Sequence, residues 1–188
     1  MRLLVAVLLC SLASAYSGTV RAQISDDLVR IGVLNDQSGV YADFGGPGSV
    51  IAARIAVEDA GGKVLGKPID IIVGDHQGKA DIGATIARQW FDADKVDMAI
   101  GFDNSSIALA VEQVALQKNR IAIAGAVATT AFTGKNCTPN EASWLQDSYA
   151  LTNTLARSVV QEVGTPGSLS PWIALSAIRS RLMQKAPL

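Results

Sequence analysis

The sequence predicts an α/β fold, a three-layer, doubly wound and mostly parallel sheet with an irregular tail, in a chain of 188 residues. One observation behind this prediction is that short apolar runs of strand length alternate with amphipathic segments of helix length. The other is the composition, since 49% of the residues are hydrophobic but only 5% are aromatic. Small and aliphatic side chains suit helices that pack closely on a buried sheet. The length suffices for one domain with its own core.

The expected elements follow one another in a regular order. Val29–Leu34 is rich in aliphatic residues and is typical of a buried strand. Gly48–Asp59 carries Val50, Ile51 and Ile55 at helical spacing. The alternation then continues with strand Ile69–Gly74, helix Asp81–Asp92, strand Val96–Gly101, helix Ser106–Lys118 and strand Arg120–Ala124. Strands separated by single helices imply right-handed crossovers and therefore a parallel sheet.

The first residues indicate export. Met1-Arg2 supplies a short positive end, and Leu3–Ala13 is an apolar run of signal-peptide length. Small residues allow cleavage after Ala15 or after Ala22, and we favour Ala22 because strand-like sequence starts soon after it. The apolar run is shorter than the ~20 residues that a membrane span needs, although an uncleaved anchor stays a minor alternative. We therefore expect a signal peptide over residues 1–22 and a periplasmic protein.

The charge balance narrows the class of partner. Sixteen Lys and Arg residues face seventeen Asp and Glu residues, so the formal charge is -1. A chain without a strong positive field is not expected to bind nucleic acid or anionic lipid. A small, roughly neutral molecule is the easier expectation. Cys10 lies in the leader, which leaves Cys137 as either a free thiol or a residue whose partner is missing from this chain.

Four loops that follow expected strands are polar or rich in glycine. They span residues 35–41, 75–77, 102–106 and 125–133. In open parallel sheets, ligands bind outside the carboxyl ends of the strands. We therefore expect all four loops to gather at one edge and to form the binding site.

The loop Asn104-Ser105-Ser106 directly precedes an apolar-periodic helix. A Ser hydroxyl there can cap the helix, while free backbone N–H groups face the cleft. Because a helix N-terminus attracts negative charge, this arrangement predicts a carboxylate site. A plain cap without any ligand is the alternative.

Other local patterns carry little chemistry. Gly45-Gly46-Pro47-Gly48 lacks the spacing and the Lys-Ser/Thr ending of phosphate-binding loops, so we interpret it as a flexible lead into a helix. His76 is the sole histidine and has only Asp75 as a near neighbour, which predicts a solvated or capping role rather than a metal site. No catalytic constellation stands out, and we expect no cofactor.

Several segments taken together resemble a known family. They are residues 29–41, 52–59, 75–81 and 104–111, and Cys137–Asn140 followed by Trp144 and residues 147–151. Their order and spacing resemble the branched-chain amino-acid (Leu/Ile/Val) substrate-binding proteins of periplasmic ABC transporters. The resemblance covers about Ile24 to Glu162.

The resemblance implies a type I periplasmic binding protein, whose two lobes close on a small-molecule ligand and deliver it to an inner-membrane ABC permease. It implies no enzymatic activity. Carried over by position, Ser105 and Ser106 would donate to the ligand's carboxylate, Tyr41 would cover the ligand, and a second contact segment would comprise Ala128, Thr129 and Thr130. That second segment departs from the family's usual Ser-rich version.

The resemblance implies an N-terminal lobe over residues 23–162. The segment 163–188 does not resemble the family, and we expect it to be a disordered tail. When the codons for Pro166–Ser168 are read one nucleotide earlier, they allow the Trp-Phe that the family would have, so a frameshift near Val163 is our hypothesis. The expected function is an incomplete substrate-binding component for branched-chain or other amino acids or small carboxylates. Alternatives are a ligand-sensing domain of the amide-sensor type and, more remotely, an exported hydrolase that uses His76.

Overall fold

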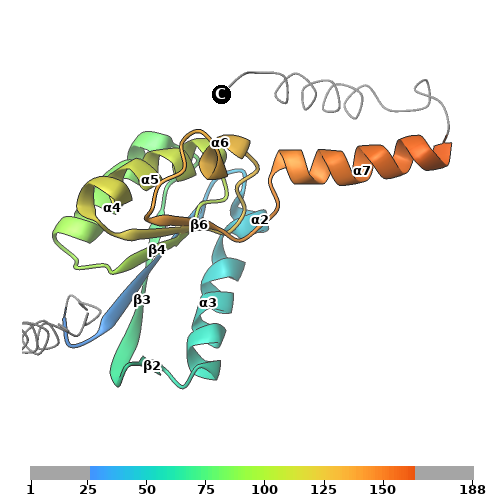
Figure 1. Ribbon diagram of the computed structural model, residues 1–188. Coiled ribbons are helices and arrows are strands. Elements are labelled where there is room, and N and C mark those ends of the chain that lie inside the picture. The colour runs from blue at the N-terminus through green and yellow to red at the C-terminus, as the bar shows by residue number, and fades with distance from the viewer. Residues whose placement is uncertain (1–25, 164–188) are drawn as a thin grey trace, which may run out of the picture.

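A computed structural model describes residues 26–163. It contains a six-stranded sheet in the order β2-β3-β1-β4-β5-β6 (Figure 1). The strands are β1 (Val29–Asn35), β2 (Lys63–Val64), β3 (Lys67–Asp75), β4 (Met98–Gly101), β5 (Ile121–Ala124) and β6 (Glu141–Ser143). All neighbours pair in parallel except β2, which runs antiparallel to β3. The prediction of a doubly wound, mostly parallel α/β sheet is confirmed.

The helices connect these strands. They are α2 (Ala42–Gly45), α3 (Pro47–Asp59), α4 (Ala80–Asp92), α5 (Ser105–Lys118), α6 (Thr130–Thr133) and α7 (Ser148–Val163). The seven elements expected from periodicity are all present, with bounds that shift by two residues or fewer at each end. The expected leader, residues 1–22, and the tail after Val163 lie outside the described residues.

The main core lies between one face of the sheet and helices α4 and α5. Leu34, Ala99 and Ala122 contribute the strand side of this core, and each is fully buried. Trp90 of α4 lies directly over the backbone of β1 and β3. Its ring is so close that a Cβ added at Gly32 or Gly74 would overlap it. Small residues in the strands therefore let α4 approach the sheet closely.

The opposite face of the sheet carries large aliphatic side chains and is covered less completely. The register places Val33 beside Val73 and Ile100, and Ile100 beside Ile123. Helix α3 lies on this side (Figure 1), but none of its residues is buried. Val73 is 41% exposed as a result. The two helical layers thus differ in how tightly they pack.

Helix α7 projects away from the sheet (Figure 1). Its first residue, Ser148, is attached to the body because its backbone N–H and its hydroxyl both donate to the Ala128 carbonyl, over 2.9 and 2.6 Å. Leu151 and Leu155 are 46% and 55% exposed. Within residues 26–163, no helix combines the length and the apolar character that a membrane crossing requires.

A strained turn joins β4 to α5. Gly101 has φ 115° and Phe102 has φ 60°, so two consecutive residues adopt conformations that L side chains disfavour. A Cβ at Gly101 would overlap the side chain of Asn35 in the neighbouring strand. Phe102 is fully buried, which helps to offset a backbone cost of about 1–3 kcal/mol.

Buried Glu112 of α5 lies beside half-buried Glu141 of the edge strand β6. Glu112 is fully buried, and burial together with the neighbouring Glu141 raises its pKa to about 8. Gln113 Nε2 lies 3.4 Å from one Glu112 oxygen, and the Thr138 hydroxyl lies 3.4 Å from one Glu141 oxygen. Glu112 is therefore protonated at neutral pH.

Replacing Gly101 with alanine should lower the free energy of unfolding by about 2–4 kcal/mol, because positive-φ strain and steric overlap add. Gly48→Ala is the matched control, since Gly48 is an exposed helical residue with open space around its Cα. That change should be neutral or stabilise by about 0.5–1 kcal/mol. Urea unfolding followed by tryptophan fluorescence measures both. Equal stability of the two variants would contradict the described turn.

The carboxyl pair should make stability depend on pH. A carboxyl whose pKa is raised on folding contributes its full stability below the unfolded pKa near 4.5 and loses it as pH rises through about 8. Glu112→Gln keeps a hydrogen-bond donor beside Glu141 but cannot ionise. Urea unfolding at pH 5 and pH 8.5 should show a steeper loss of stability for the wild type than for Glu112→Gln. Parallel losses would show that the pair does not titrate as described.

Candidate functional site

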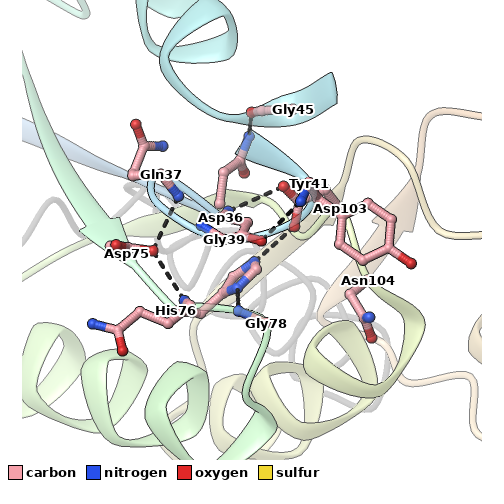
Figure 2. A network of polar contacts seen from close by, with 12 residues as sticks. Asp36, Gln37, Gly39, Tyr41, Gly45, Asp75, His76, Gly78, Asp103 and Asn104 are labelled. Carbon is pink, nitrogen blue, oxygen red and sulfur yellow. Dashed lines mark hydrogen bonds and ion pairs between the residues drawn. The ribbon is translucent and has the colours of Figure 1, made fainter. Parts of the chain in front are cut away.

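The carboxyl ends of β1, β3, β4 and β5 meet at one edge of the sheet, as their register shows. Asn35 pairs with Asp75, Leu34 with Gly101, and Gly101 with Ala124. The four polar loops predicted to form the binding site therefore leave the sheet side by side. Figure 2 shows the network of polar contacts that connects three of them.

The first loop, after β1, folds around the Asp36 carboxylate. One Asp36 oxygen accepts from the Gly39 backbone N–H over 2.7 Å, and the other accepts from the Tyr41 N–H over 3.0 Å. The Asn35 side-chain amide donates to the Gly45 carbonyl. These bonds place Tyr41, a predicted ligand contact, at the start of α2 with 39% of its surface exposed.

The Asp75 carboxylate connects the first loop to the loop after β3. It accepts from the backbone N–H groups of Gln37 and Gln77, over 3.0 and 2.9 Å, and from the Ser38 hydroxyl over 2.6 Å. Desolvation by burial raises the pKa of Asp75, but the hydrogen bonds from Ser38, Gln37 and Gln77 outweigh it and lower the pKa below its usual value. Asp75 is therefore ionised at neutral pH and can accept all three bonds.

His76 is fully buried, so of the two predicted roles, solvated or capping, the solvated one is wrong. Its Nε2 lies 2.7 Å from Asp103 Oδ1, and its Nδ1 accepts from the Gly78 backbone N–H over 3.1 Å. The other Asp103 oxygen accepts from the Asp36 backbone N–H over 3.0 Å. The contact partner of His76, Asp103, is far from it in the sequence, so the local sequence pattern around His76 does not predict the contact.

Asn104, rather than a serine, caps helix α5. Its side-chain oxygen accepts from the Ser106 backbone N–H over 2.9 Å and from the Ser106 hydroxyl over 2.7 Å. The expectation that a Ser hydroxyl caps the helix is thus wrong, because Asn and Ser are about equally good caps and Asn104 comes first. Ser105 is the first residue of the helix, and its side chain has no hydrogen-bond partner within residues 26–163.

The second predicted contact segment surrounds the start of the short helix α6. Thr129 caps this helix, since its hydroxyl accepts from the Ala131 N–H over 3.2 Å. Thr130 is the first residue of the helix. The Ala128 carbonyl accepts a hydrogen bond from the Ser148 hydroxyl over 2.6 Å. The starts of α5 and α6 follow neighbouring parallel strands, and the Gly125 N–H donates to the Gly101 carbonyl over 2.7 Å.

The glycine run before α3 is packed rather than flexible. Gly45 and Gly46 are both buried. A Cβ at Gly45 would lie 2.9 Å from the Asp103 side chain, and one at Gly46 would lie 2.5 Å from the Asp36 carbonyl. The glycines therefore allow this segment to approach the polar network, a role that the expectation of a flexible lead missed.

Metal and thiol chemistry find no support in the described part of the chain. Residues 26–163 contain no group of three or more His, Cys, Asp or Glu side chains that could hold a metal ion. Cys137 is exposed and forms no disulfide among these residues. What the edge of the sheet offers instead is a set of hydroxyls and helix N-termini.

Comparisons with known proteins agree with this geometry. Residues 28–174 match the family model described as periplasmic binding protein. A search of curated proteins gave no match. The matched range takes in every strand and helix described above.

Solved structures give the same result. A periplasmic binding protein from Burkholderia mallei is 41% identical, with a TM-score of 0.71 over 74% of this chain and 37% of that chain. A branched-chain amino acid ABC transporter periplasmic ligand-binding protein from Burkholderia xenovorans is 31% identical, with a TM-score of 0.73 over 83% of this chain and 44% of that chain.

A more distant structure, an ABC transporter solute-binding protein from Rhodopseudomonas palustris in complex with 3,4-dihydroxybenzoic acid, shares the fold. It is 23% identical, with a TM-score of 0.61 over 72% of this chain and 38% of that chain. The present chain thus spans less than half the length of these relatives. It belongs to the periplasmic binding protein family that includes the branched-chain amino acid ABC-transporter substrate-binding proteins.

Proposed function

We propose that the chain is a substrate-binding component of an ABC transporter and that it holds the carboxylate of an amino acid or small carboxylic acid at the start of α5. The observation that carries this proposal is the pair of helix starts after β4 and β5, which lie side by side at the carboxyl edge of the sheet. Membership of the family supports a substrate-binding role in an extracytoplasmic location.

The chemistry of the α5 start suits an anion. The first-turn N–H groups of a helix have no partner within the helix, and the helix dipole places partial positive charge there. Helix α5 has 14 residues; the Asn104 side chain already accepts from the Ser106 N–H, and the Ser105 N–H and hydroxyl lie beside this cap. Thr129 and Thr130 add hydroxyls at the neighbouring start of α6. A ligand carboxylate would accept from these groups without needing a cation.

The choice of ligand class rests on the Burkholderia xenovorans relative, which is described as a branched-chain amino acid transporter protein. We therefore take L-isoleucine and L-leucine as the first probes. In the proposed arrangement, Tyr41 covers the bound molecule from the first loop. An inner-membrane ABC permease would receive the ligand, and the leader at residues 1–22 would direct export to the periplasm.

The proposed role is ligand binding rather than catalysis. A hydrolase would depend on His76 as its base, but this ring is fully buried and both of its nitrogens are engaged, by Gly78 and by Asp103. A general base must reach the proton that it removes. No observation in residues 26–163 favours the hydrolase over the receptor.

Isothermal titration of the full chain with L-isoleucine and L-isoleucinamide tests the proposed carboxylate site. The amide keeps the side chain and the amino group but lacks the carboxylate, so it should bind at least about tenfold more weakly, since hydrogen bonds to a charged group contribute about 1.5–3 kcal/mol. Ser105→Ala should weaken isoleucine binding by a similar factor. Ser49→Ala, in α3, is the matched control and should leave affinity unchanged.

Two results would contradict the proposal. One is equal binding of the acid and the amide, which would remove the carboxylate from the recognition chemistry. The other is an absence of binding for every amino acid and small carboxylate tested at millimolar concentration.

A further inference from the structure

We infer that His76 and Asp103 are positioning residues for the ligand site: their contact holds the loop after β1 and the start of α5 in one fixed arrangement. This inference rests on the proposed function and deepens it. Neither residue belongs to the predicted ligand contacts, and both are buried away from solvent. They would act on the ligand through Tyr41, Asn104 and Ser105.

Asp103 joins three loops with one carboxylate. Its Oδ1 lies 2.7 Å from His76 Nε2 in the loop after β3, and its Oδ2 accepts from the Asp36 N–H, 3.0 Å away in the loop after β1. Asp103 itself belongs to the loop after β4. The side chains of His76 and Asp103 are 0% and 2% exposed, so water does not compete for these contacts (Figure 2). A buried charge without such partners would be costly.

The orientation of the His76 ring follows from its second contact. Nδ1 accepts from the Gly78 N–H, and Nε2 lies 2.7 Å from Asp103 Oδ1, so the ring is held from two sides. The turn at Gln77 and Gly78, with φ 52° and 69°, directs the Gly78 N–H back to the ring. The backbone of the β3 loop thus turns Nε2 of the ring toward Asp103.

Backbone strain next to Asp103 explains why such a contact is needed. Gly101 and Phe102 both have positive φ, and such conformations persist only where the surroundings over-determine them. The contacts of Asp103 with His76 and with the Asp36 N–H hold the far side of this turn. The next residue, Asn104, is the cap of α5. The turn, the cap and the helix start are therefore fixed as one unit.

The same carboxylate also orients the first loop. The Asp36 N–H donates to Asp103, and the Asp36 side chain accepts from the Gly39 and Tyr41 N–H groups. The Tyr41 backbone is thus linked through Asp36 to Asp103, the residue before the cap of α5. A site whose parts are held in place before binding loses less entropy when the ligand arrives.

Two isosteric substitutions separate the two contacts of His76. In His76→Asn the side-chain oxygen occupies about the place of Nδ1, so the Gly78 contact is kept and the Asp103 contact is lost. In His76→Gln the side-chain amide reaches about as far as Nε2, so the Asp103 contact is kept and the Gly78 contact is lost. Asp103→Ala removes the partner from the other side.

Amide hydrogen exchange of the full chain, resolved by residue with NMR and without ligand, reads out the arrangement. In His76→Asn, exchange at Asp36, Tyr41 and Ser106 should rise by about tenfold or more, whereas His76→Gln should keep these amides within about twofold of the wild type. The Gly78 amide should show the reverse pattern. Amides in the middle of α5, such as Val114, should not change in either variant. In an Asp103→Ala background, His76→Asn should add nothing, because the two residues act as a pair.

Unchanged exchange at Asp36, Tyr41 and Ser106 in His76→Asn would overturn the inference, and so would an equal rise across the whole chain in both variants. The second readout is the dissociation constant for L-isoleucine, which should rise about tenfold in His76→Asn and recover in His76→Gln. An unchanged constant despite loosened loops would show that the contact does not position the ligand site. If no solute binds but the exchange pattern holds, the proposed function fails while the coupling of the loops stands.

Discussion

The Asp103 carboxylate is buried at the carboxyl edge of the sheet, and the loops of the candidate site depend on how that charge is satisfied. Removing a carboxylate from water costs several kcal/mol unless hydrogen bonds and an opposite partial charge replace the lost hydration. Here the Asp36 N–H donates to one oxygen and His76 Nε2 lies 2.7 Å from the other, so the two contacts come from two different loops. The need to satisfy one buried group therefore fixes three loops relative to one another, and the glycines at 45 and 46 leave room for this contact.

The sheet makes this arrangement possible because its central strands are parallel and end together. Right-handed crossovers return every helix to the same starting edge, so the starts of α4, α5 and α6 all lie near the loops of the site. The core between the sheet and α4 and α5 is tightly packed, with Trp90 against Gly32 and Gly74. Rigid packing on that side holds the strand ends, and polar contacts on the edge hold the loops.

Much of this fold could be predicted from the sequence, since Val29–Leu34 and Asp81–Asp92 have the hydrophobic periodicity of a strand and a helix. The three-residue strand β6 and the four-residue helix α6 could not, because so few residues carry no periodic signal. The edge at which the polar loops gather followed from topology alone. The burial of His76 did not, because it depends on a partner that only the folded chain brings near. Similarly, Asn104 and the serines after it have similar capping preferences, so geometry rather than residue type decides which one caps α5.

The central claim is that the start of α5 receives a carboxylate, and NMR titration of the uniformly ¹⁵N-labelled full chain tests it most directly. On addition of L-isoleucine, the account predicts that the backbone amides of Ser105 and Ser106 shift first and furthest, together with those of Thr129 and Thr130. L-isoleucinamide at the same concentration should leave these four amides nearly unmoved. Shifts confined to another part of the chain, or equal shifts with the acid and the amide, would contradict the account.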